Sequence, residues 1–270
     1  MAKDYKKFRK EIWRYYRHHK RVLPWRKTQN PYHILISEIM LQQTQVGRVI
    51  PYYQAFIKAF PNFETLSRAS TAQVLKLWQG LGYNRRALNL KKLVKIVLEK
   101  YGGELPHDPE ILKNLPGIGK GTAGAIAAFA FGKPVPFLET NIRRVFIHFF
   151  FRKKKNVNDR EILKYVEATL DRKNPREWYY ALMDYGAMLA KTTENPNRRS
   201  RSYHRQSRFR GSNRELRGKI LKLFLQKQTL TESAISFSLA EPKSRLKSVL
   251  AELKKEGFLK KKNRRFALAS

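Results

Sequence analysis

Between residue 8 and about residue 195, apolar residues recur at intervals of three and four positions, with short breaks rich in glycine or proline. This spacing places apolar side chains on one face of a helix. Clear examples are the segments Thr71–Trp78, Ala87–Tyr101, Asp159–Leu170 and Pro175–Leu189. Because few stretches alternate as strands do, we predict a mainly α-helical domain over residues 1–195.

The pattern changes after Gly211. Helical spacing occurs over Arg214–Gln226, in a shorter segment that begins at Thr231, and in a third that begins at Glu241-Pro242. The basic segment Phe258–Leu268 then has the pattern of a β-hairpin. Three helices followed by a hairpin are typical of a winged-helix module.

We therefore predict a winged-helix-like domain at residues 213–270, joined to the first domain by a basic linker at 196–212. Residues 211–270 contain 15 basic and 5 acidic residues. This balance favours DNA contact, with Arg264 and Arg265 in the hairpin, over a small protein-interaction module.

The helix that Asn30 is expected to cap carries a carboxylate on its apolar face. Glu38 has Ile34, Leu35 and Leu41 as neighbours at helical spacing. Burial disfavours the charged form of a carboxyl group, so we expect a raised pKa for Glu38, which suits a general acid. A buried, hydrogen-bonded structural glutamate would give the same pattern, and this helix alone does not separate the two.

Two short helical segments, Pro109–Leu115 and Gly121–Phe131, flank the sequence Pro116-Gly117-Ile118-Gly119. Glycine permits positive φ and lets a ligand approach the backbone, and amides at a helix N-terminus attract anions. This is the pattern of a helix-hairpin-helix, which binds a nucleic-acid phosphate without reading sequence, although a plain helical turn is the alternative. The residues predicted to contact phosphate are Gly117, Gly119, Lys120, Gly121 and Thr122.

Glu139 lies just before an amphipathic helix that begins at Ile142. We expect the helix N-terminus to favour the ionised carboxylate and so to lower its pKa. One carboxyl group with a raised pKa and another with a lowered one is typical of an acid paired with an anionic stabiliser. Cleavage at the anomeric carbon of a sugar requires such a pair. The alternative is a glutamate that only caps a helix.

Five motifs occur in the order found in MutY-type adenine DNA glycosylases, which belong to the helix-hairpin-helix superfamily together with endonuclease III. They are Leu23-Pro24-Trp25-Arg26, Ser37–Val46, Trp78–Tyr83, Leu115–Gly119 and Met183–Met188. The chain resembles this family over about residues 8–195. The resemblance implies a two-lobed fold, with the hairpin in one lobe, both chain ends in the other, and a catalytic cleft between them.

The resemblance also implies roles for individual residues. Glu38 matches the acid that protonates a flipped purine, Glu139 stands at the position of the catalytic Asp, and Asn141 matches an Asn that supports both carboxylates. Gln42 and Tyr83 match residues that wedge into the duplex. The DNA contacts predicted in these two motifs are Gln42, Gln43, Thr44 and Tyr83.

Three departures from the family pattern matter. Glu139-Thr140 replaces the usual Asp-Gly, so the geometry near the sugar must adjust to a longer side chain. Gly121 occupies the position of the lyase lysine of bifunctional relatives, so we expect no strong β-lyase activity. The family's iron–sulfur cysteines fall on Ala190, Asn197, Ser200 and Gln206. The chain has no cysteine, so we expect neither this cluster nor a disulfide.

The segment Arg198–Arg210 contains six arginines and no acidic residue. Arginines interleaved with Ser, Tyr and Phe suit phosphate contact and stacking. We predict that Arg198, Arg199 and Arg201 contact the DNA backbone, and a disordered basic linker remains equally open.

The net charge of +36 in 270 residues predicts salt-sensitive binding to a polyanion. No apolar stretch reaches the roughly 20 residues of a membrane-spanning helix, and no apolar signal-peptide core follows the N-terminus. We expect a cytoplasmic, nucleoid-associated protein without a membrane partner.

We predict a monofunctional DNA glycosylase that hydrolyses the N-glycosidic bond of adenine mispaired with 8-oxoguanine or guanine. Its partner is double-stranded DNA with a flipped base, and we expect a monomer. No cofactor or metal is required, although a monovalent cation can sit in the hairpin turn at Gly117 and Gly119. We expect the family's Nudix-like C-terminal domain, which inspects the opposite base, to be absent. The alternatives are a glycosylase for thymine or uracil opposite guanine and a catalytically silent DNA-binding protein.

Overall fold

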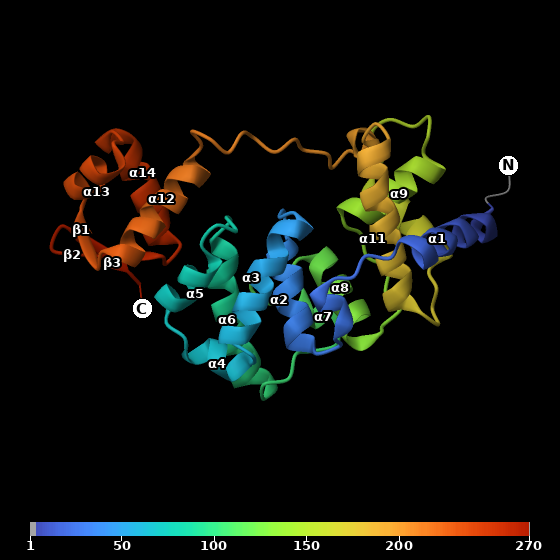
Figure 1. Cartoon of the computed structure of the whole chain (residues 1–270), viewed down its shortest axis with the longest axis horizontal. Coiled ribbons are helices and arrows are strands. Elements are labelled where there is room, and N and C mark those ends of the chain that lie inside the picture. The colour runs from blue at the N-terminus through green and yellow to red at the C-terminus, as the bar shows by residue number, and fades with distance from the viewer. Residues whose placement is uncertain (1–3, 270) are drawn as a thin grey trace. The chain divides into compact units, whose positions relative to one another are not determined.

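The computed structural model describes residues 4–269 (Figure 1). The chain divides into two compact units. The first contains the residues up to Glu38 and Pro106–Arg205, and the second contains Ile39–Leu105 and the residues from Gln206 onwards. Helix α2 (Pro31–Leu41) begins in the first unit and ends in the second.

The first unit is built from helices around an aromatic core. Figure 1 shows α1, α9 and α11 side by side, and these helices pack against one another. Phe8, Phe146 and Trp178 are among the buried rings between them. Besides the start of α2, the helical elements of this unit are α1 (Tyr5–His19), η1 (Pro24–Lys27), α7 (Pro109–Leu112), α8 (Lys120–Phe131), α9 (Thr140–Phe150), α10 (Asp159–Thr169), α11 (Pro175–Thr192) and η2 (Pro196–Arg199).

The second unit contains four helices before residue 106, and these bury Phe56, Trp78 and Leu90. Ser70 caps α5 by accepting a hydrogen bond from the amide of Gln73, and α6 ends where Gly102 adopts a φ of 60°. The helices are α3 (Val46–Ala59), α4 (Phe63–Arg68), α5 (Thr71–Trp78) and α6 (Arg85–Tyr101).

The C-terminal module, described over residues 213–269, contains the predicted three helices and hairpin. Apolar side chains of all three helices, including Leu216, Ile235 and Leu246, are buried with Phe258 and Phe266. The elements are α12 (Asn213–Gln226), β1 (Thr229–Thr231), α13 (Glu232–Leu239), α14 (Lys243–Lys255), β2 (Leu259–Lys262) and β3 (Arg265–Leu268).

The three strands form an antiparallel sheet in the order β1-β3-β2. Thr229 pairs with Ala267 across β1 and β3, and Lys262 pairs with Arg265 across the hairpin. Asn263 and Arg264 both have positive φ, 47° and 62°, as a two-residue hairpin turn of type I′ requires.

Two sequence expectations need correction. The helix expected over Pro109–Leu115 ends at Leu112. The helix-hairpin-helix turn was expected in a lobe without the chain ends, yet its residue Gly117 lies in the same unit as α1.

No helix within residues 4–269 is long and apolar enough to cross a membrane.

Candidate active site

Glu38 lies half-buried in the last turn of α2. As expected, Asn30 begins this helix: its Oδ1 accepts hydrogen bonds from the amides of Tyr32 (2.9 Å) and His33 (3.2 Å). Ile34 and Leu35 are buried beside it. Burial, with a contribution from the charge of Glu139, raises the pKa of Glu38 to about 8, although Arg26 opposes the shift. Glu38 therefore holds a proton near neutral pH.

Glu139 caps α9 and belongs to the same unit as Glu38. Its Oε1 accepts a hydrogen bond from the amide of Ile142 (2.7 Å), and its Oε2 accepts a longer one from Nδ2 of Asn141 (3.4 Å). The expected lowering of its pKa is wrong. Burial raises the pKa of Glu139 and outweighs the helix amides and nearby guanidinium groups that favour the carboxylate.

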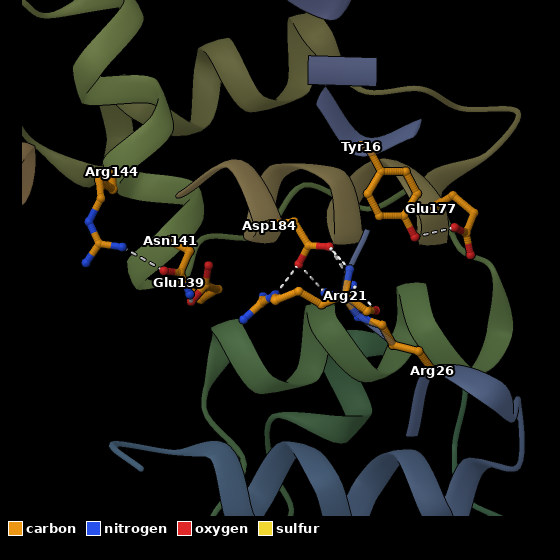
Figure 2. A network of polar contacts seen from close by, with 8 residues as sticks. All are labelled: Tyr16, Arg21, Arg26, Glu139, Asn141, Arg144, Glu177 and Asp184. Atoms are coloured by element: carbon orange, nitrogen blue, oxygen red, sulfur yellow. Dashed lines mark hydrogen bonds and ion pairs between the residues drawn. The ribbon is translucent and has the colours of Figure 1, made fainter. Parts of the chain in front are cut away.

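Asn141 is held in place by the buried Arg144. Figure 2 shows Arg144 reaching Asn141, which lies beside Glu139. Arg144 Nη1 donates to Oδ1 of Asn141 and to the carbonyl of Gly186, both at 2.7 Å. Gly186 allows this approach, since a Cβ there would lie 2.4 Å from the carbonyl oxygen of Asn141. The sequence did not single out Arg144.

Asp184, on α11, accepts hydrogen bonds from two arginines in the same unit (Figure 2). Arg26 donates to both carboxylate oxygens at 2.8 Å, and Arg21 donates through Nε at 2.6 Å and its amide at 2.9 Å. Burial alone would raise the pKa of Asp184, but these donors lower it. The motif Met183–Met188 contains Asp184 but does not by itself mark it as an ion-pair residue. A carboxylate between the buried Tyr180 and Tyr185 is the signal that would have found it.

The predicted phosphate-binding hairpin has the expected turn at Gly117, where φ is 82°. Gly119 is extended and stands as the N-cap of α8, and both Gly119 and Lys120 are exposed. A Cβ at Gly121 would lie 2.9 Å from the carbonyl oxygen of Leu138, so a lysine there would displace the backbone that leads to Glu139. Thr122 is half-buried in the first turn of α8.

The predicted wedge residues lie in two turns of the second unit. Gln42, Gln43 and Thr44 follow α2, and Tyr83 precedes α6; Gln43 and Tyr83 have φ values of 54° and 47°. The buried Arg86, which the sequence analysis missed, joins the turns.

Arg86 donates hydrogen bonds to backbone carbonyls at the end of α2 and in both turns. Its guanidinium donates to the carbonyls of Met40 and Gln42, both at 2.7 Å, and to those of Ile39 (2.9 Å) and Gly82 (3.1 Å). A buried arginine thus fixes the shape of both turns.

The three arginines predicted to contact DNA after α11 differ in their surroundings. Arg198 is exposed and pairs with Glu194 at 3.0 Å, and Arg201 is exposed. Arg199 instead donates to the carbonyls of Phe151 (3.0 Å) and Arg152 at the end of α9. This contact gives Arg199 a role in the fold. In the C-terminal module, Arg264 and Arg265 are exposed.

The described residues contain no group of three or more His, Cys, Asp or Glu able to hold a metal ion. The positions at which relatives place cluster cysteines carry an aliphatic side chain, two amides and a hydroxyl, which do not supply thiolates. These residues do not fit an iron–sulfur cluster. A monovalent cation at the hairpin stays a prediction.

Comparison with known proteins gives consistent relatives. Residues 36–170 match the HhH-GPD superfamily base excision DNA repair protein family. The adenine DNA glycosylase of Buchnera aphidicola subsp. Baizongia pistaciae is 43% identical over 187 residues, which cover 67% of this chain and 52% of the relative. That of Mycolicibacterium smegmatis is 34% identical over 237 residues, which cover 81% and 80%. The chain spans about half the length of the first of these relatives.

Two solved structures resemble this one. A thermostable thymine-DNA glycosylase is 31% identical, with a TM-score of 0.64 over 69% of this chain and 87% of that one. Endonuclease III in a non-covalent DNA complex is 20% identical, with a TM-score of 0.58 over 68% of this chain and 85% of that one, and this likeness concerns the fold alone.

Proposed function

Because this chain belongs to the MutY-type adenine DNA glycosylases of the HhH-GPD superfamily of base excision DNA repair proteins, we propose that it removes adenine from duplex DNA. The observation that carries the proposal is the pair of Glu38 and Glu139. Both side chains lie in one unit, and the charge on Glu139 helps Glu38 to keep its proton.

In the proposed mechanism, Glu38 is the general acid. It donates a proton to a ring nitrogen of the flipped adenine, and the electron pair of the breaking N-glycosidic bond passes to the base. The carboxylate of Glu139 stabilises the cationic sugar that remains. Water then adds to the anomeric carbon and loses a proton, which leaves an abasic site. Asn141 keeps Glu139 oriented through its 3.4 Å hydrogen bond.

The enzyme reaches its base by binding and bending the duplex. The exposed amides at Gly119 and Lys120 bind a backbone phosphate, while Gln42, Gln43, Thr44 and Tyr83 enter the duplex beside the extruded nucleotide. Charge of +36 supplies sequence-independent affinity. We propose that the enzyme acts as a monomer and that Arg198, Arg201, Arg264 and Arg265 extend this contact.

We further propose that the enzyme is monofunctional and that its substrate is adenine opposite 8-oxoguanine or guanine. The crowding at Gly121 supports the first point, because a lysine nucleophile does not fit there without movement of Leu138. The second candidate function is removal of thymine or uracil opposite guanine. The similarity to a thymine-DNA glycosylase favours it, whereas a proton donor such as Glu38 suits a purine, whose ring nitrogens accept protons.

A single-turnover assay on four duplexes separates these functions. They carry adenine opposite 8-oxoguanine, adenine opposite guanine, thymine opposite guanine and uracil opposite guanine, with products resolved before and after alkali. The expected result is alkali-dependent cleavage only at adenine, slower by about 100-fold or more in Glu38→Gln and unchanged in the surface control Glu167→Gln. Cleavage at thymine or uracil would move the enzyme to the pyrimidine group. Intact DNA binding without any cleavage would leave a silent DNA-binding protein.

A further inference from the structure

The short helix η2 (Pro196–Arg199) packs against α9, whose N-cap is Glu139 and whose first turn contains Asn141. Asn197 in this helix is a buried polar residue with 4% of its surface exposed. Its Nδ2 donates a 3.0 Å hydrogen bond to the carbonyl of Thr140, the residue between Glu139 and Asn141. One amide therefore joins η2 to the turn that bears both predicted catalytic side chains.

The orientation of the Asn197 amide follows from its partners. Its Oδ1 has no hydrogen-bond partner, so a flipped amide would lose the bond and set oxygen against the carbonyl of Thr140. The bond that Nδ2 donates to Thr140 is thus the polar contact that the side chain of Asn197 makes with α9.

A second contact runs from Asn195 to α9. Oδ1 of Asn195 accepts from the amide of Asn197 (3.1 Å) and, at 3.4 Å, from Nε of Arg144. Arg144 in turn donates to Asn141 at 2.7 Å. Hydrogen bonds therefore connect η2 with the turn Glu139–Asn141 by two routes, through the Thr140 carbonyl and through Arg144.

The segment that follows η2 is fixed by backbone pairing. The amide of Val157 donates to the carbonyl of Arg199 (2.8 Å), and the amide of Arg201 donates to the carbonyl of Val157 (2.9 Å). Ser200 lies buried between these bonds. Asn197 therefore projects from an element that has a second anchor at Val157, outside α9, and this supports a positioning group.

We propose that Asn197 is a positioning residue for the glycosidic reaction: by holding the Thr140 carbonyl, it fixes the turn that aims Glu139 and Asn141. The inference rests on the proposed function for its catalytic consequence. It also assigns a task to a segment whose side chains do not fit a metal cluster. In this segment, hydrogen bonds of the Asn197 amide and of the backbone hold η2 against α9 and Val157.

The test compares Asn197→Asp and Asn197→Ala with the wild type and with Asn158→Ala. Asn158 caps α10 in the same unit, where its side chain accepts a hydrogen bond from the amide of Arg160, so its loss controls for general destabilisation. The Asp variant keeps the shape of Asn197 but replaces the donor by an oxygen. When its new carboxyl group is protonated, it can donate to the Thr140 carbonyl again.

We expect Asn197→Ala to lower the single-turnover rate on an adenine mispair by about 10-fold, with DNA affinity within about twofold of the wild type. The rate of Asn197→Asp relative to wild type should be lowest in alkali and recover as pH falls, whereas the relative rate of Asn197→Ala should not vary with pH. Rates within about twofold of wild type for both variants, at a temperature where both are folded, would overturn the proposal.

Hydrogen exchange in the free proteins tests the same contact without catalysis. Asn197→Ala should speed amide exchange in the first turn of α9, and Asn158→Ala should do so only in α10. Unchanged exchange in α9 would refute the positioning role even if the wild type removed no base. A wild type inactive on every duplex, with faster α9 exchange in Asn197→Ala, would instead refute the proposed function and keep the contact.

Discussion

Glu139 raises the pKa of Glu38, although the two glutamates belong to different helices and lie far apart in the sequence. The charge of Glu139 acts on the pKa of Glu38. Glu139 accepts hydrogen bonds from the start of α9 and lies near Arg143 and Arg144, all of which favour its ionised form. Glu38, at the other end of a helix, has only Arg26 to oppose its burial. Burial raises the pKa of both groups, and the charge of Glu139 adds to the rise at Glu38, which therefore keeps its proton near neutral pH.

Substitutions at Glu139 should separate charge from length. Glu139→Gln removes the charge that would stabilise the cationic sugar, and we expect the single-turnover rate on an adenine mispair to fall by about 100-fold. Glu139→Asp keeps the charge and a helix-capping group and should stay within about 10-fold of wild type. A Gln variant as fast as the Asp variant would show that the charge is not used.

The pair should also make stability depend on pH. Because the pKa of Glu38 is raised from 4.5 to about 8, the folded protein retains a proton that the unfolded chain releases, and stability falls as pH rises through this window. Glu38→Gln avoids the cost. We expect this variant to be about 5 kcal/mol more stable than wild type above the upper pKa and equal to it below the lower one. Urea unfolding across the window measures this, and a wild type more stable in alkali would contradict it.

Asp184 should matter for stability more than its small size suggests. Asp184→Asn leaves the Arg26 side chain, which is 8% exposed, without its carboxylate, and we expect a loss of about 3 kcal/mol. The control Asp159→Asn breaks a more exposed pair with Arg143 and should cost about 1 kcal/mol or less.

The low pKa of Asp184 predicts the pH at which its contribution disappears. The carboxylate stabilises the fold above its unfolded pKa of 3.8, and the stabilisation is lost as pH falls through the lower folded pKa. Denaturant midpoints of wild type and Asp184→Asn should therefore converge in acid. Equal midpoints at neutral pH would show that the ion pair adds nothing.

The hairpin arginines should contribute to DNA affinity in a salt-dependent way. Arg264→Ala and Arg265→Ala should each weaken binding to any duplex and reduce the slope of log affinity against log salt by about 1. Arg172→Ala, on the surface of the first unit and paired with Glu167, is the control. An unchanged slope in both hairpin variants would remove the C-terminal module from the DNA contact.

The features that the sequence predicted well are local ones. Glu38 could be found because its apolar neighbours stand three and four positions away on the same helix, and Gly117 because a tight turn before a helix has a strong sequence pattern. The hairpin β2–β3 was predictable for the same reason. The partner strand β1 is three residues long and pairs with β3 far along the chain, so no local pattern marked it.

The features that the sequence missed depend on distant partners. Arg26 and Asp184 stand 158 positions apart, and Arg86 bonds a carbonyl 46 positions away at Met40. The error in the pKa of Glu139 has the same origin. The sequence indicates that Glu139 precedes a helix, but the burial that outweighs the helix amides arises from tertiary packing.

The pH dependence of the single-turnover rate tests the central claim, that Glu38 is the proton donor. The rate on an adenine mispair should be highest where Glu38 is protonated and Glu139 is ionised, and it should fall about tenfold per pH unit above about pH 8, because Glu38 must be protonated to act. Glu38→Gln should be slower by about 100-fold or more and lose this decline. A wild-type rate that stays level through this pKa, or a Gln variant that keeps the same alkaline decline, would contradict the claim.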